Sequence, residues 1–326
     1  MAKKGKQPPS REVTKRRLAR WEQERRRRRI TVIIGSSIVA VVIAVVACGY
    51  YFTQVAPARE WLSKVGPAGD RTVIYAGDYV ETLRLYQLGL YQSSTDQRQE
   101  PLVLLENRAL VLKAAQAYPI DPVTDDAIDE EVRAMLVAED EDVDEEELEE
   151  RYQAVLTTFA LTDGQFRDIV RVGILEQRLD EYLKGQLPQV GAEVRHAHVE
   201  AIVVADEETA QEVEERLEEE EFTALADEYG LGDIGWLPEG LMGPGFDDVA
   251  FTIELDTASE PVVAQGGYYI VRVLEREDRA LEQSMRQTME ANVFSFWLEE
   301  EREEKVERNP GLDLDQTFLW ALDQIS

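Results

Sequence analysis

The residue types that most often carry catalytic or metal chemistry are scarce in this chain. Its 326 residues include two histidines, His196 and His198, and one cysteine, Cys48. Histidines two positions apart share one face of an extended segment, so this pair could bind a metal ion or exchange protons with a ligand. A solvated entry into a strand is the simpler interpretation. We expect no metal or cofactor, because the sequence lacks a metal-spaced Cys and His set, a phosphate-binding glycine loop and a Gly-x-Ser-x-Gly motif.

A second candidate for chemistry is an acidic run in which Asp140, Asp142 and Asp144 alternate as in a calcium-binding loop. Such a loop needs Gly at its sixth position and Glu at its twelfth, and these positions hold Glu145 and Arg151 here. The run is therefore predicted to be an exposed acidic connector that leads into a helix.

The stretch Val194–Glu277 has the most informative pattern. Its apolar run Ala201–Ala205 predicts a strand, and Ala210, Val213 and Leu217 then recur at helical spacing. The pieces that follow are predicted to be a helical segment (Phe222–Tyr229), a glycine-rich turn (Gly232–Gly240), a short helix (Phe246–Phe251) and a final strand (Tyr268–Leu274).

Several spaced motifs in this stretch agree with one family: Asp233–Trp236, Gly240–Phe246, Ala250–Phe251, Ser259–Val262 and Gln265–Tyr268. Together they resemble the parvulin-type peptidyl-prolyl isomerase domain. The resemblance implies a small α/β domain with an antiparallel sheet. It also implies catalysed rotation about X-Pro bonds, whose barrier of about 20 kcal/mol arises from amide resonance.

The same resemblance implies an apolar pocket for the proline ring. Met242 and Phe246 match the pocket residues, and Trp236 and Leu241 are further candidates beside them. Alternatively, both are ordinary core residues, Phe246 in a short helix and Met242 in the segment before it.

The polar half of the family's site is not matched. Family members carry one His on the first strand and another on the last, and those positions hold Ala201 and Tyr269 here. The loop between Tyr229 and Asp233 is also short, so it lacks the segment that normally supplies a Cys or Asp. Tyr269 and His198 remain weak candidates to replace the lost groups. Because an enzyme must bind the twisted amide better than the planar one, we expect isomerase activity to be weak or lost.

Charge divides the chain sharply. Residues 1–29 carry 13 basic and 3 acidic residues, whereas residues 30–326 carry 22 basic and 63 acidic residues, a net charge of −41 that argues against nucleic-acid binding. The stretch Ile30–Phe52 has 23 residues without a charge, enough to span the hydrocarbon layer as a helix. The predicted topology is a single-pass cell-membrane anchor with a cytoplasmic N-terminus, since basic residues stay on the cytoplasmic side.

A cleaved signal segment is the competing interpretation. Val45–Cys48 resembles a lipobox, whose cysteine would become the lipidated N-terminus of a lipoprotein. The long basic region and the apolar Tyr50–Phe52 after it favour the uncleaved anchor.

Helical patterns fill the rest of the chain. Residues from Arg71 resemble the strand, turn and helix that open the N-terminal domain of SurA and PrsA type foldases. Leu102–Ala115 is predicted to be a buried central helix, and Thr124 and Thr162 are predicted to be N-caps. Leu281–Arg308 is predicted to be one long helix, and the resemblance to these foldases implies that it packs back on this domain.

The conformation of two shorter segments is also predicted. Trp61–Val65 falls in a predicted spacer and would form at most a helical turn. Thr317–Leu322 either docks on the body or presents a hydrophobic tag.

The predicted fold class is α+β, with a transmembrane helix, a mainly helical SurA-N-like domain, a parvulin-like domain and a C-terminal helix. The expected parts are a basic cytoplasmic tail (residues 1–29), the anchor (30–52), a linker (53–70), the helical domain (71–190), the parvulin-like domain (191–277) and the C-terminal helix with its tail (278–326).

Two functions are consistent with these parts. The first is an extracytoplasmic folding factor that acts mainly as a chaperone for unfolded or newly exported polypeptides and their proline-containing segments. The second is a non-catalytic interaction subunit of a secretion or envelope complex.

Overall fold

The computed structural model describes residues 36–325 except 38, 93–95, 138–142 and 265. The basic tail, the first residues of the expected anchor, Asp140 and Asp142 of the calcium-like run, and Gln265 lie outside the described residues. The chain divides into two compact units, residues 1–60 and 61–326.

The described part of the first unit is an apolar helix. Within it, Val39–Ala58 is long and apolar enough to cross a membrane, with a mean hydropathy of 1.9 over its best window. It includes a π-helical turn, η1 (Tyr51–Val55), and the short α2 (Ala56–Ala58). The helix thus continues beyond Phe52, where the uncharged stretch was expected to end, because no charged residue follows before Arg59.

The second unit begins with a three-stranded antiparallel sheet that joins distant parts of the sequence. β1 (Trp61–Val65) is the central strand, between β2 (Thr72–Tyr75) and β7 (Val306–Arg308). The prediction of a helical turn at Trp61–Val65 is wrong, since Leu62, Ser63 and Val65 are buried in this strand. The long C-terminal helix also ends earlier than predicted, because its last three residues pair with β1.

The helical part of this unit follows the predicted order. Thr124, Asp144 and Thr162 cap three of its helices by accepting hydrogen bonds from backbone N–H groups two or three residues into the helix. Asp144 thereby confirms that the acidic run leads into a helix. The helices are α3 (Ala76–Gln87), α4 (Glu100–Ala117), α5 (Asp125–Leu136), α6 (Glu145–Thr158), α7 (Asp163–Gln186), α11 (Gln283–Lys305) and α12 (Leu314–Ile325).

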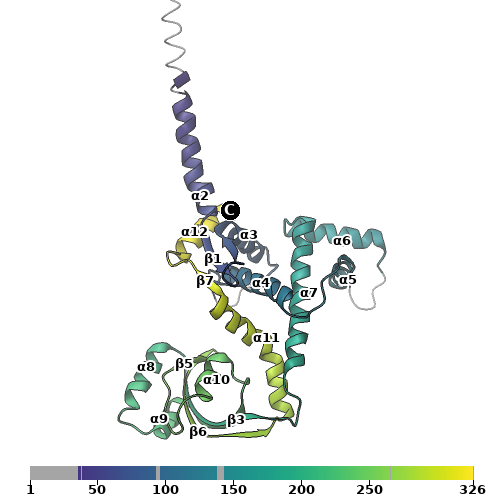
Figure 1. Ribbon diagram of the computed structural model, residues 1–326. Helices are drawn as coiled ribbons and strands as arrows, with labels where there is room; N and C mark the ends of the chain where they lie inside the picture. The colour runs from purple at the N-terminus through teal and green to yellow at the C-terminus, as the bar shows by residue number, and fades with distance from the viewer. Residues whose placement is uncertain (1–35, 38, 93–95, 138–142, 265, 326) are drawn as a thin grey trace, which may run out of the picture. The chain divides into compact units, whose positions relative to one another are not determined.

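The C-terminal helix packs back on the helical part, as predicted. α4 lies at the centre of the main core with Leu102 and Leu110 buried, and Trp297 of α11 joins the same core. Ala321 of α12 is also fully buried there, and α12 contacts α3. The segment Thr317–Leu322 therefore docks on the body (Figure 1).

One ion pair with a buried carboxylate ties β7 to this core. The carboxylate of Glu106 on α4 has no exposed surface and accepts two hydrogen bonds from Arg308 on β7, at 3.0 and 2.9 Å. A buried carboxylate is tolerated only when it is paired and hydrogen-bonded in this way.

The third structural part is a four-stranded antiparallel sheet in the order β4-β3-β6-β5. Its two faces hold separate apolar clusters, one closed by α10 and the other by α8 and α9. Its elements are β3 (Glu193–Val204), α8 (Glu207–Arg216), α9 (Phe222–Tyr229), β4 (Leu231–Pro238), α10 (Pro244–Ala250), β5 (Val262–Ala264) and β6 (Gly267–Ala280). The predicted glycine-rich turn is in fact mostly the edge strand β4, because Gly232 and Gly235 fit positive backbone angles within it.

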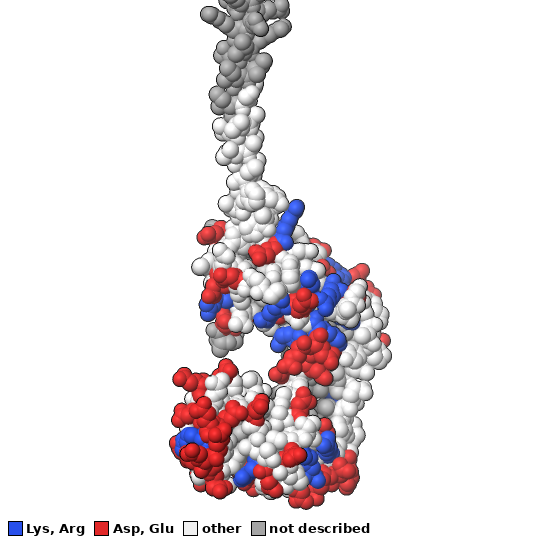
Figure 2. Space-filling view, turned by 60° about the vertical axis from the view of Figure 1, so that its left-hand side comes forward, with Lys and Arg blue, Asp and Glu red and all other residues white. Residues whose placement is uncertain are grey.

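Acidic side chains are dense on this part of the molecule, the lower part of Figure 2. The helix α8 alone contributes five of them, Glu207, Glu208, Glu212, Glu214 and Glu215. The mixed helical and antiparallel architecture confirms the predicted α+β class.

We predict that Arg308→Ala destabilises the second unit by about 3 kcal/mol, because it leaves the Glu106 carboxylate buried without its partner. Chemical unfolding followed by tryptophan fluorescence measures this. Arg133→Ala is the matched control: it breaks an ion pair of similar length, 2.6 Å to Glu145, whose side chains are both exposed, so it should change stability little. Equal effects of the two substitutions would contradict the prediction.

Candidate functional site

The candidate proline pocket lies on the α10 face of the four-stranded sheet. Phe246, Ala201 and Val271 are buried in one cluster there, and Met242 and Tyr269 pack against it. β3 and β6 run antiparallel with Ala201 opposite Val271 and Val203 opposite Tyr269. The two positions that resembled the family's histidine sites therefore lie on adjacent strands and on the same face.

This cluster is closed in the structure. Phe246 is only 1% exposed, and the ring of Tyr269 meets it edge to face at 5.8 Å between ring centroids. Met242 and Tyr269 keep part of their surface exposed. An incoming proline ring would have to displace Tyr269 before it could contact Phe246.

Neither histidine belongs to this cluster as far as the structure describes it. Ala201 offers only a methyl group there, and both histidines lie elsewhere on β3. His196 is 2% exposed, and its Nδ1 lies 2.8 Å from the carbonyl oxygen of Val194. The interpretation of both histidines as a solvated strand entry is therefore wrong for His196.

His198 lies on the opposite face of β3 from the cluster, because it falls between Ala197 and Val199, which both belong to the cluster. Its Nε2 is 2.9 Å from Oδ1 of Asp233, and its ring stacks on Trp236. The N–H of Gly235 donates to the Asp233 carboxylate, and this hydrogen bond and the one with His198 hold the pKa of Asp233 below its ordinary value.

Two further candidate residues lie elsewhere in the domain or at its edge. Trp236 stands opposite His198 in the β3–β4 pairing, its ring stacks on that of His198, and the Arg279 guanidinium lies 4.3 Å from its ring centroid. Leu241 is buried in a second cluster with Leu281 and Met289, and Met242 packs against both this cluster and that of Phe246.

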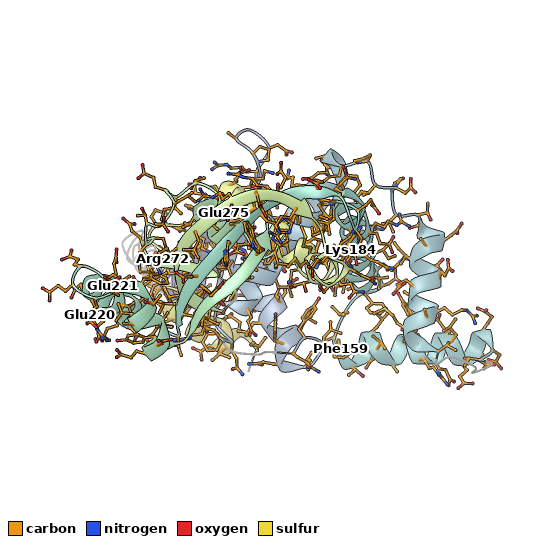
Figure 3. The ribbon with its side chains drawn as sticks, turned by 90° about the horizontal axis from the view of Figure 1, so that it is seen from below. Phe159, Lys184, Glu220, Glu221, Arg272 and Glu275 are labelled. Carbon is orange, nitrogen blue, oxygen red and sulfur yellow. The ribbon has the colours of Figure 1, made fainter. Side chains whose placement is uncertain are left out.

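The sheet face that carries His198 also bears charged side chains. Glu200 on β3 forms an ion pair with Arg272 on β6, and Glu275 stands opposite His198 in the register. Figure 3 labels Arg272 and Glu275 along this strand.

The loop that bears Met242 is fixed by a buried carboxyl group that the sequence did not single out. Oδ2 of Asp247 accepts a hydrogen bond of 2.9 Å from the N–H of Gly240. Burial raises the pKa of Asp247 to about 7, against the opposing effect of the N–H groups of Gly240 and Gly243. Asp247 follows Phe246 directly, and nothing in that pattern distinguishes it from an exposed helical carboxylate.

The same loop touches the C-terminal helix α11. A Cβ atom at Gly240 would lie 2.9 Å from the Met289 side chain, and one at Gly243 would lie 2.9 Å from the Phe296 ring. Both glycines have positive φ, +93° and +104°, which side chains disfavour. The pocket loop is therefore held between Asp247 and α11.

Comparisons with known proteins agree with this architecture. A family model described as a PPIC-type peptidyl-prolyl isomerase (rotamase) domain matches residues 197–275. The foldase protein PrsA of Geobacillus sp. strain WCH70 is 28% identical over 206 residues, which are 57% of this chain and 69% of that protein. PrsA of Halalkalibacterium halodurans is 32% identical over 208 residues, 57% of this chain and 60% of that protein.

The chain therefore spans between about three fifths and two thirds of the lengths of these two relatives. A crystal structure of PrsA from Bacillus anthracis aligns with 62% of this chain and 96% of its own, at 20% identity and a TM-score of 0.31. Because that TM-score is low, the similarity to PrsA rests on the sequence relatives and on the domain match.

We predict that Asp247 makes the free energy of unfolding fall as pH rises from about 4 to 7. In that range Asp247 is ionised in the unfolded chain and protonated in the folded chain. Protonation therefore stabilises the folded state at low pH, and this stabilisation is lost as the pH rises to about 7. Asp247→Asn removes this titration. Relative to wild type, its stability should rise by on the order of 3 kcal/mol between pH 4 and pH 8.

Urea unfolding at both pH values measures this difference. Asp248→Asn is the matched control, since Asp248 is the exposed next residue of the same helix and its variant should follow wild type. Parallel pH curves for wild type and Asp247→Asn would show that burial of Asp247 has no such effect.

Proposed function

We propose that this chain, which is similar to PrsA foldases and carries a PPIC-type domain, is a membrane-anchored extracytoplasmic folding factor that acts mainly as a chaperone. Its parvulin-type domain would contribute apolar contacts to proline-containing segments, and its isomerase activity would be weak or lost. The observation that carries this proposal is the closed cluster of Ala201, Phe246 and Tyr269, which has no histidine among its members.

Physical chemistry supports a weak isomerase. Rotation about an X-Pro bond breaks no covalent bond, so acceleration depends on groups that stabilise the twisted amide. Loss of one preorganised hydrogen-bond donor commonly costs 10²- to 10³-fold in rate. Here both histidine positions have changed, and the Phe246 ring is covered by Tyr269.

The charge of the chain supports a holding function. The net charge of −41 beyond residue 29 would keep a complex with an unfolded polypeptide soluble and would favour basic clients. The same charge repels the phosphates of nucleic acids. Unfolded or newly exported polypeptides are thus the proposed partners.

The proposed location is the outer side of a cell membrane, with residues 30–52 as a single-pass anchor and the N-terminus in the cytoplasm. This rests on the apolar helix Val39–Ala58 and on the 13 basic residues that precede it in sequence. A lipoprotein attached through Cys48 is the second choice, and Cys48 is exposed on that helix.

We predict that the protein isomerises prolyl peptides at least about 100-fold more slowly than a parvulin domain that carries both histidines. It should nevertheless suppress aggregation of a chemically unfolded protein at stoichiometric concentrations. A protease-coupled prolyl-peptide assay and light scattering measure the two activities. Tyr269→Phe and His198→Ala should leave any residual isomerase rate unchanged.

Isomerisation at ordinary parvulin rates that withstands Met242→Ala would overturn both the proposed loss of activity and the pocket assignment. Failure to suppress aggregation, together with recovery of one stoichiometric partner from detergent extracts, would favour an interaction subunit instead of a chaperone.

We predict that the mature protein retains its N-terminal basic residues. Intact-mass spectrometry of the membrane fraction should find the segment before Cys48 still attached, and Cys48→Ser should change neither the mass pattern nor the membrane fraction. A mature chain that begins at a lipidated Cys48, and a precursor that accumulates in Cys48→Ser, would establish the lipoprotein instead.

A further inference from the structure

The apolar helix of the first unit is joined to the second unit by a very short link. The helix continues beyond Phe52, the outer end of the proposed anchor, to Ala58, a rise of about 9 Å. Arg59 and Glu60 then lead to Trp61, the first residue of β1, over about 11 Å at most. Both link residues donate a backbone hydrogen bond to the carbonyl oxygen three residues before, so the link is turned and not extended. In an anchored chain the start of β1 is therefore kept beside the lipid headgroups.

Three segments from distant parts of the sequence meet at the start of β1. Tyr75, the last residue of β2, stands opposite Trp61 in the antiparallel register. Nδ2 of Asn309 donates a hydrogen bond of 2.9 Å to the carbonyl oxygen of Trp61, and α12 begins shortly after Asn309. α12 also contacts α3, which begins directly after Tyr75 (Figure 1). We call this end of the second unit, made of Trp61, Tyr75 and α12, the anchor end.

The anchor end exposes large apolar side chains. Tyr75 is 43% exposed and Leu319 of α12 is 63% exposed, while Trp61 keeps part of its surface accessible. Tyr and Trp combine an apolar ring with a polar edge, and they are enriched where a protein meets the interface between membrane and water. The side-chain Nζ of Lys64 lies 3.8 Å from the centroid of the Trp61 ring, with its apolar stem beside the ring. This combination fits the interfacial zone of a bilayer.

We propose that the anchor end docks on the outer surface of the membrane, with Trp61, Tyr75 and Leu319 in the interfacial zone of neutral phospholipids. This rests on the proposed membrane anchor and goes beyond it, because the second unit itself becomes a peripheral membrane domain. A docked unit cannot swing freely about the link, so its helical part stays at a fixed distance from the bilayer. A second copy of the chain could cover the same side chains, but the covalent link brings only the membrane to them.

The charges at the anchor end favour neutral lipid over anionic lipid. The ammonium group of Lys64 lies 3.7 Å from the Glu307 carboxylate, so its charge is already balanced within the sheet. Asp315 and Asp323 are exposed on α12 and would repel anionic headgroups. Docking must therefore come from burial of apolar surface, which does not depend on lipid charge.

Quenching by labelled lipid tests the proposal on the full chain in phosphatidylcholine nanodiscs. Cys48→Ser removes the one cysteine, and Leu319→Cys then carries a nitrobenzoxadiazole fluorophore. Met135→Cys is the matched control, because Met135 is 60% exposed on α5 of the same unit and lies outside the anchor end. Phosphatidylcholine with a nitroxide on its headgroup should remove most of the fluorescence at position 319 and little at position 135. Partial replacement by phosphatidylglycerol should not increase the quenching.

Proteolysis provides a second measurement that needs no label. Trypsin cleaves after Arg59, and docking should protect this bond in nanodiscs. Tyr75→Asp combined with Leu319→Asp should speed this cleavage at least about tenfold, because both substitutions place a carboxylate in the interfacial zone. Met135→Asp should cleave as wild type does. Since all three side chains are exposed, the melting temperatures of these variants should equal that of wild type.

Equal quenching at positions 319 and 135, in a chain that stays in the nanodisc and still suppresses aggregation, would overturn docking alone. Loss of the chain from the nanodisc would overturn the proposed anchor together with the docking. Oxidation of unlabelled Leu319→Cys to a disulfide-linked dimer, without quenching of the label, would show that a second copy covers the anchor end. Stronger quenching with phosphatidylglycerol would overturn the assignment to neutral lipid.

Discussion

The pairing of β1 with β7 is the constraint on which the second unit depends. It brings residues 61–65 beside residues 306–308, nearly the whole length of the unit apart in sequence. The bidentate pair of Glu106 with Arg308 then ties that strand to the buried centre of α4. As a result, α11 packs against the helical core and ends at the three-stranded sheet. Because Trp297 of α11 lies in the main core, the C-terminal third of the chain completes a domain that the N-terminal third begins.

The parvulin-type domain depends on the same helix. Met289 and Phe296 of α11 contact the glycine loop that carries Met242, and Asp247 holds that loop from the other side. Packing thus keeps the Met242 loop and Phe246 in place, and Ala201 and Tyr269 lie on the same face of the sheet. Packing and catalysis make separable demands on such positions: an apolar cluster needs volume and shape, whereas a twisted amide needs donors and acceptors.

The helical part also holds polar side chains in a largely apolar cavity. Arg108, Glu176 and Tyr91 reach it from three segments, and burial raises the pKa of Glu176 and Tyr91. The acidic exterior, dense over the parvulin-type domain in Figure 2, would keep the held chain in solution.

The sequence by itself determined the local features of this protein. Helical spacing, the caps at Thr124 and Thr162, the uncharged stretch from Ile30 and the parvulin motifs each depend on residues close together in the chain, so their patterns survive without a structure. The motifs also predicted that Met242 and Phe246 would belong to one apolar pocket, with Ala201 and Tyr269 at the family's two histidine positions.

Only the tertiary structure decided the features that depend on distant partners. Trp61–Val65 is a strand because β7 pairs with it, and His196 is buried because of where β3 lies in the sheet. Trp236 lies on the sheet face opposite the candidate pocket, because it pairs with His198 across β3 and β4. The convergence of Arg108, Glu176 and Tyr91 arises in the same way, because side chains from separate helices meet only after those helices have packed.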